Sequence, residues 1–130
     1  MKVTKQFLED LRAYIWMERF AVVRNPSALP KEYFCVIKDK AETTLIVNEN
    51  NLPEKYKEKE SDYRIITFDA TLPFELVGFT ARISGAMSEA GVSILSIVAY
   101  STDHFLVKNA DLPKARKALE KIGVKVYEIK

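Results

Sequence analysis

One stretch of the chain, residues 76–107, limits the fold more than any other because it carries only three formal charges. A segment of this length with so few charges must be buried or form an interface. The segment before it, 54–64, is mostly charged, which is typical of a solvated connector. We therefore expect the boundary between two halves of the chain at 49–62.

The second half has the clearest pattern of secondary structure. Alternating β-branched and aromatic residues indicate strands, and apolar residues at helical spacing indicate helices. The predicted elements are strand 63–69, a helix that begins at Thr71-Leu72-Pro73 and ends at Gly91, strand 92–100, strand 104–108, helix 111–122 and strand 124–129. The order βαββαβ predicts an α+β, ferredoxin-like fold.

The first half resembles a degenerate copy of the same unit. Its predicted elements are a helix within 4–15, strand 19–24, a helical turn between Pro26 and Pro30, strands 33–38 and 43–48, and a short helix at 52–58. We therefore divide the chain into residues 1–62, a degenerate unit with a leading helix, and residues 63–130, a complete unit.

Composition and charge exclude several classes of protein. The net charge is only +2, and each half of the chain carries +1, whereas nucleic-acid binders usually concentrate basic residues on one face. No apolar run approaches the roughly 20 residues of a membrane-spanning helix. Glu9, Asp10 and Arg12 lie where a signal peptide would need an apolar stretch. We expect a cytoplasmic protein that binds neither nucleic acid nor membranes.

The sequence offers little for catalysis or metal binding. His104 is the single histidine and Cys35 the single cysteine, and each lies among apolar residues of a predicted strand. One nitrogen and one sulfur ligand are too few for most transition-metal sites, and neither residue has a partner in the sequence for nucleophilic catalysis. We expect no enzyme activity, no catalytic residue, no metal and no cofactor.

Gly78 and Asp103 are the two positions that suggest a ligand. Glycine inside a helix is unfavourable, and near a helix N-terminus it leaves backbone N–H groups open to a carboxylate. Asp103 lies at a predicted turn, where it could face a cationic group. The alternatives are close helix packing at Gly78, a turn-forming role for Asp103, and core positions for Phe74 and Phe79.

Residues 73–108 resemble the ACT-type regulatory domains, and in particular the tandem ACT proteins. This group includes small prokaryotic proteins and the eukaryotic cytosolic arginine sensors. The similarity rests on Gly78, Gly91, Ser96 and the run Thr102-Asp103-His104. In the first half, Phe20-Ala21-Val22, Pro26, Pro30 and Phe34-Cys35 are similar to the degenerate first unit of that group.

This resemblance implies two side-by-side ACT-like units, a homodimer and an amino-acid ligand over the strand-to-helix loop. The residues it assigns to ligand binding are Pro73, Phe74, Leu76, Gly78, Phe79 and Asp103. In the arginine sensors an acidic residue at the position of Asp103 faces the cationic side chain of the ligand. Leu76 departs from the pattern, since those sensors have an acidic group there, so the ligand stays unidentified.

The function we predict is that of a non-catalytic regulatory or sensor protein that binds an amino acid and acts on an unidentified protein partner. A homodimer is also predicted by strand 92–100, which is apolar on both faces. One alternative is a structural oligomerisation module without a ligand. Another is a ferredoxin-like module that binds single-stranded RNA.

Overall fold

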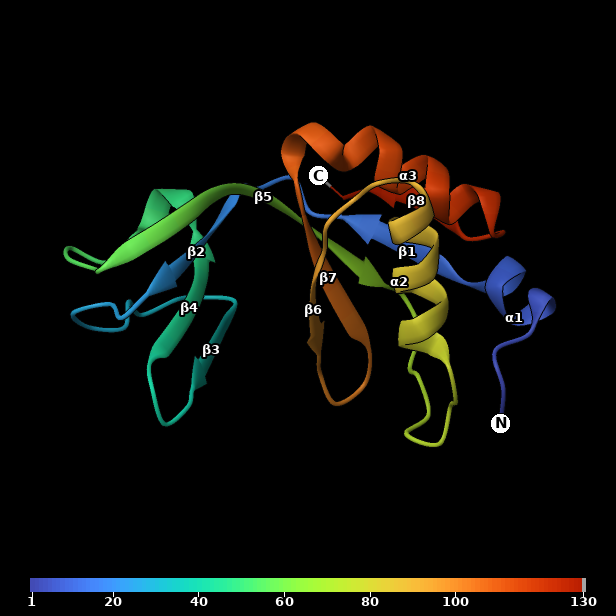
Figure 1. Ribbon diagram of the computed structural model, residues 1–130, viewed down its shortest axis with the longest axis horizontal. Helices are drawn as coiled ribbons and strands as arrows, with labels where there is room; N and C mark the ends of the chain where they lie inside the picture. Colours follow the sequence, from blue (N-terminus) through green and yellow to red (C-terminus); the bar gives the residue numbers. More distant parts are fainter. Residues whose placement is uncertain (130) are drawn as a thin grey trace. The chain divides into compact units, whose positions relative to one another are not determined.

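The computed structural model describes residues 1–129 and contains two compact units (Figure 1). The larger unit joins Met1–Met17 with Arg64–Lys130, and the smaller unit is the continuous segment Glu18–Tyr63. The sequence-based division assigned residues 1–62 to one unit. The structure instead groups the first seventeen residues with the second half of the chain.

The elements of the larger unit are α1 (Lys5–Asp10), β1 (Arg12–Ile15), the second half of β5 (Glu58–Phe68), α2 (Phe79–Glu89), β6 (Leu95–Val98), β7 (Asp103–Lys108), the 3-10 helix η2 (Asn109–Asp111), α3 (Leu112–Lys121) and β8 (Lys125–Glu128). The smaller unit contains β2 (Phe20–Arg24), β3 (Cys35–Lys38), β4 (Thr43–Asn48), the 3-10 helix η1 (Glu49–Asn51) and the first half of β5. The predicted α+β, ferredoxin-like fold is confirmed.

The sheet of the larger unit contains one strand more than the predicted βαββαβ pattern. Its strand order is β6-β7-β5-β1-β8. Strand β1 runs antiparallel to β5 and parallel to β8, so that Ala13 lies opposite both Phe68 and Val126. The N-terminal segment therefore separates the first strand of the ferredoxin-like pattern from its last.

The predicted helix within residues 4–15 is wrong over its second half. Helix α1 ends at Asp10, and Arg12–Ile15 form strand β1. The apolar residues that suggested a helix are nevertheless buried: Leu8, Leu11 and Ile15. Their spacing suits a helix, but a short helix followed by a strand buries the same side chains.

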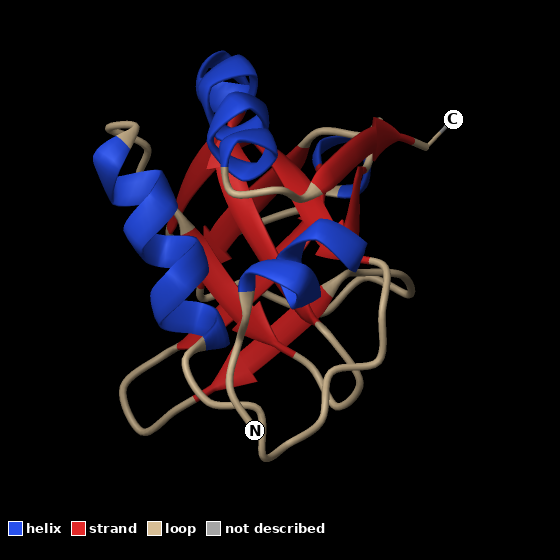
Figure 2. Cartoon of the chain, turned by 90° about the vertical axis from the view of Figure 1, so that its right-hand side faces the viewer, coloured by secondary structure: helices blue, strands red, loops and turns tan. Residues whose placement is uncertain are grey.

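The core of the larger unit lies between its sheet and its helices. Alternate strand residues face this core, because side chains of a strand point to opposite faces in turn. The largest fully buried side chains of this core are Phe68, Phe105, Leu8, Ile15, Ile66, Met87 and Leu119. Figure 2 shows the helices lying in front of the strands, where they cover this face of the sheet.

Helix α2 begins later than the sequence predicted. Gly78 has a φ of 86°, in the left-handed region, and the helix starts at Phe79. The Thr71-Leu72-Pro73 segment is therefore not a helix start. The N–H groups of Leu72 and Val77 donate instead to the carbonyls of Ser101 and Met1, so the segment forms a loop with partners elsewhere in the unit.

The smaller unit keeps a ferredoxin-like strand order without α-helices. Its order is β3-β4-β2-β5, and all three pairings are antiparallel. The helical turn between Pro26 and Pro30 and the helix at 52–58 were predicted wrongly, since the structure has irregular chain there. The charged segment 58–63, expected to be a connector, is strand, and Glu58 forms an ion pair of 2.8 Å with Arg24.

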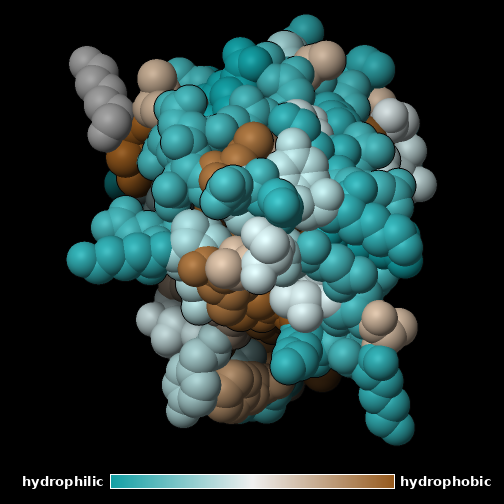
Figure 3. All heavy atoms as spheres, turned by 90° about the vertical axis from the view of Figure 1, so that its left-hand side faces the viewer, coloured by the Kyte–Doolittle hydropathy of each residue, from teal (hydrophilic) through white to brown (hydrophobic). Residues whose placement is uncertain are grey.

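The face of the molecule drawn in Figure 3 is mostly hydrophilic, with smaller hydrophobic areas between charged and polar side chains. The exposed large apolar side chains of the smaller unit are Leu29, Tyr33 and Ile37. Individual side chains of this kind are ordinary on protein surfaces. Across residues 1–129, none of the helices has the length and apolar character needed to cross a bilayer.

Gly85 has open space around it. A Cβ at this position would meet no atom within 4 Å, and the residue lies in the interior of α2. Gly85→Ala should therefore raise the free energy of unfolding by about 0.5–1 kcal/mol, because alanine restricts the unfolded chain more and favours the helix. Chemical denaturation would measure this. An unchanged or lower stability would contradict the open environment.

Candidate functional site

The structure brings all six predicted ligand-binding residues together around one pocket of about 390 Å³ in the larger unit. The pocket lies between the loop that leads into α2 and the turn between β6 and β7. The lining residues are Leu72, Pro73, Phe74, Leu76, Gly78, Phe79, Thr80, Ala81, Val98, Ala99, Tyr100, Ser101, Thr102 and Asp103. Its volume falls within the range of small-molecule sites in proteins.

Backbone hydrogen bonds hold the pocket loop at both ends. The N–H of Leu72 donates to the carbonyl of Ser101 at 2.6 Å, and the N–H of Val77 donates to the carbonyl of Met1 at 2.9 Å. The hydroxyl of Thr102 donates to the carbonyl of Phe68 at 2.7 Å. Loop, turn and the first residues of the chain are thus joined into one frame around the pocket.

Aromatic side chains form both the base and the rim of the pocket. Phe79 is only 5% exposed, and its ring meets Phe68 edge to face at a centroid distance of 4.9 Å. Phe74 and Tyr100 are 74% and 82% exposed and form a second edge-to-face pair, also at 4.9 Å. The core interpretation therefore holds for Phe79 and fails for Phe74. The sequence did not single out Tyr100.

Gly78 lies at the N-cap of α2, and no side chain caps this helix. A Cβ at this position would meet no atom within 4 Å, so close packing is not the reason for glycine here. The reason is the φ of 86°, which residues with a Cβ rarely adopt. Phe79, Thr80 and Ala81 of the first helical turn line the pocket, and the N–H groups and dipole of a helix N-terminus attract anions.

Asp103 provides the only formal charge among the residues that line the pocket. Partial burial raises the pKa of its carboxyl group, and a hydrogen bond with the Thr80 side chain counteracts this in part. The site therefore combines an anion-attracting helix end with a half-buried carboxylate. Pro73 and Leu76 complete it as half-buried apolar residues.

Two further polar residues, Glu75 and Cys35, lie outside the pocket. Glu75, the acidic neighbour of Leu76, is exposed and does not line it. Cys35 belongs to the smaller unit, where it is half-buried and burial raises the pKa of its thiol. Within residues 1–129 the structure contains no cluster of three or more His, Cys, Asp or Glu side chains able to hold a metal ion.

His104 has a structural environment next to the pocket. Its Nδ1 lies 2.7 Å from the hydroxyl oxygen of Thr67, which also accepts a hydrogen bond of 2.8 Å from the indole N–H of Trp16. Because the indole group only donates, the Thr67 hydroxyl can donate to Nδ1, which suits a neutral imidazole. Burial lowers the pKa of His104 in agreement with this.

Part of this sequence matches a known protein family. Residues 58–121 match the protein family described as ACT domain. This segment begins with β5 and ends with α3, so it includes the whole pocket. No curated protein matches the chain.

Solved structures share the fold at low sequence identity. A protein of Agobacterium tumefaciens has a TM-score of 0.81 at 16% identity, with 92% of this chain and 94% of that chain covered. The regulatory subunit of aspartate kinase from Thermus thermophilus has a TM-score of 0.61 at 10% identity, with 85% and 95% covered.

The aspartate kinase of Clostridium acetobutylicum, described as an allosteric enzyme, has a TM-score of 0.67 at 13% identity. The match covers 87% of this chain but only 34% of the kinase chain. The similarity therefore concerns about a third of that enzyme, and at this identity it establishes the fold alone.

The environment of His104 leads to a pH-dependent stability. Its folded-state pKa lies below the ordinary value of 6.5, so the unfolded chain binds the proton more readily. Stability should therefore fall as the pH decreases from about 7.5 to about 5.5. In His104→Asn, which keeps an acceptor near Thr67, this loss should be smaller. Thermal unfolding across this range would measure it, and equal pH profiles would contradict it.

Proposed function

We propose that the larger unit binds a small molecule, an amino acid, in the pocket between residues 72–78 and 98–103, and that binding has a regulatory purpose. The main support for this proposal is the pocket itself, which combines the N-terminus of α2, where no side chain caps the helix, with the carboxylate of Asp103. These two groups match the two charged ends of an amino acid.

Each part of the ligand has a complementary group in the pocket. The first-turn N–H groups of α2 suit a carboxylate, because the helix dipole adds to their hydrogen bonds. Asp103 suits an ammonium or guanidinium group through charge-assisted hydrogen bonds. The exposed pair Phe74 and Tyr100 can cover an aliphatic stem or lie against a cation. A basic amino acid therefore fits this chemistry better than an acidic one.

A regulatory role is supported by the ACT-domain match and by the likeness to the regulatory subunit of an aspartate kinase. We propose that the protein is non-catalytic. Among the residues that line the pocket, Asp103 is the only Asp, Glu, His, Cys or Lys, so it has no second group of these types to act with. The RNA-binding alternative lacks support from β7, where Phe105 is buried rather than presented for stacking.

We further propose that the protein is a homodimer. Four large apolar side chains near the pocket mouth are more than 60% exposed: Phe74, Val77, Val98 and Tyr100. Strand β6, which carries Val98, pairs only with β7 among the described strands. A second copy that covers this edge would remove both the apolar surface and the unpaired strand edge from water.

Asp103→Asn should separate ligand binding from folding. The substitution removes the negative charge, so the binding free energy of a cationic amino acid should weaken by about 1.5–3 kcal/mol, the range for a hydrogen bond to a charged group. The stability of the free protein should stay equal or rise, because burial disfavours the charged carboxylate. A thermal-shift screen of the twenty amino acids, followed by calorimetry, would measure both quantities.

Glu75→Gln is the matched control for Asp103→Asn. Glu75 lies in the same loop and is exposed, but it does not line the pocket, so its loss should leave affinity unchanged. Equal affinity of wild type and Asp103→Asn for every amino acid that binds would refute the assignment. The absence of any thermal shift with all twenty would favour an oligomerisation module without a ligand.

Sedimentation at micromolar concentrations should give the mass of two chains. Tyr100→Glu places a charge at the most exposed member of the apolar group and should shift this equilibrium toward the monomer. Ile37→Glu, at an exposed apolar residue of the smaller unit, is the control and should have no such effect. A monomer in the wild type would contradict the dimer.

A further inference from the structure

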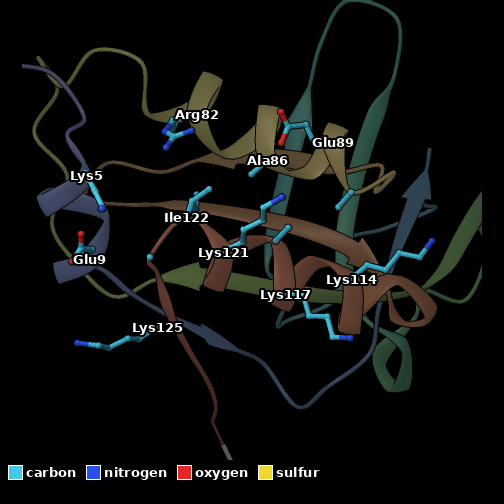
Figure 4. A pocket seen from close by; sticks show the side chains of 13 residues that line it. Lys5, Glu9, Arg82, Ala86, Glu89, Lys114, Lys117, Lys121, Ile122 and Lys125 are labelled. Carbon is cyan, nitrogen blue, oxygen red and sulfur yellow. The ribbon is translucent and has the colours of Figure 1, made fainter.

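A second and larger cavity lies in the larger unit, away from the amino-acid pocket. It is a groove of about 920 Å³ between α2 and α3, and α1 lies at one end (Figure 4). The groove shares no lining residue with the pocket. Its thirteen lining residues come from α1, α2, α3 and the segment up to the start of β8.

Cations surround this groove. Six lining residues are basic, and only Glu9 and Glu89 are acidic. The basic residues are Lys5, Arg82, Lys114, Lys117, Lys121 and Lys125. In the described part of the chain none of these six takes part in an ion pair, whereas Arg19, Arg24, Arg64 and Arg116 all do. The groove therefore concentrates unneutralised positive charge in a protein with a net charge of only +2.

The floor of the groove is apolar, and most of its side chains are small. Ala86 and Ala90 lie one helical turn apart on α2, and Ala118 and Ile122 are similarly spaced at the end of α3. The two helices are in contact, and the short side chains leave the hollow between them. A basic rim around an apolar floor suits a ligand that has both acidic and apolar faces.

We propose that this groove binds an acidic amphipathic helix of a partner protein. A helix laid between α2 and α3 would place apolar side chains on the alanine floor and carboxylates beside the lysines. Helix α3, with ten residues, offers a wall about 15 Å long, enough for roughly three turns of a bound helix. Nucleic acid fits less well, because no lining residue is aromatic and the floor is apolar.

The proposal can be tested on the full-length chain with synthetic peptides. The probe is a fluorescein-labelled peptide of about 15 residues with leucine and alanine on one helical face and glutamate on the other. A peptide of the same composition in scrambled order keeps the charge but has no apolar face. Fluorescence anisotropy should show binding of the amphipathic probe and much weaker binding of the scrambled one. Binding should also weaken as the salt concentration rises.

Three variants locate the binding. Lys117→Glu combined with Lys121→Glu reverses charge on the exposed side of α3 and should weaken binding at least about tenfold. Ala86→Tyr fills the floor without a change of charge and should have a similar effect. Lys38→Glu combined with Lys40→Glu makes the same charge change at exposed residues of the smaller unit and should have little effect. Thermal unfolding verifies that each variant is folded.

Several outcomes would overturn the proposal. If the scrambled peptide bound as tightly as the amphipathic probe, the groove would be attracting any polyanion rather than an amphipathic helix. Tighter binding of a single-stranded oligonucleotide, lost in the Lys117 and Lys121 variant, would make the groove a nucleic-acid site. The groove would not be a helix-docking surface if the amphipathic probe did not bind. The same conclusion would follow if the Lys38 and Lys40 variant lost as much peptide affinity as the Lys117 and Lys121 variant. If Ala86→Tyr does not fold, the comparison of peptide binding between the two charge-reversal variants still tests the proposal.

Discussion

The larger unit depends on the pairing of β1 with two strands that lie far from it in sequence. Strand β1 fills the space between β5 and β8, and β8 has no other partner among the described strands. The N–H of Lys125 donates to the carbonyl of Leu11, and the N–H of Ile129 donates to the carbonyl of Ile15. These two hydrogen bonds extend the parallel pairing of β1 with β8 at both ends. Because α3 leads directly into β8, the placement of that helix also depends on β1. The residues that precede the ferredoxin-like pattern are thus part of its framework.

The spacing of apolar residues did not predict the type of every element correctly. Leu8, Leu11 and Ile15 are buried, but their helical spacing could not reveal that the chain changes from helix to strand at Leu11. The start of α2 was misplaced for a different reason. Proline in a first turn is a sound helix signal, but Leu72 and Val77 have long-range backbone partners that a local pattern does not encode. Residues 58–63 were likewise predicted as a connector because they are charged. They form a strand because they pair with β2, which lies some forty residues earlier.

The candidate site was predictable where it rests on local chemistry. A glycine in the first turns of a predicted helix and a lone aspartate after an apolar strand are visible in the sequence, and the structure brings Gly78 and Asp103 to one pocket. Thr80 and Tyr100 were missed because each acquires its relevance from a neighbour distant in sequence, Asp103 and Phe74 respectively. Asp103 also illustrates a conflict between stability and binding. Burial opposes its charged form, yet that charge is what a cationic ligand would recognise.

The insertion of β1 also has a consequence for the order of folding. Residues Glu18–Tyr63 form a continuous unit whose strands pair within one short segment, so all of its strand pairings are available once this segment has been synthesised. The larger unit cannot complete its sheet until Lys125–Glu128 have been synthesised, because β1 needs them along its second edge. The N-terminal strand must therefore wait for almost the whole chain, and such non-local closure slows folding. Until then, the edge of β1 that pairs with β8 lacks its partner strand, and unpaired strand edges are prone to mispairing.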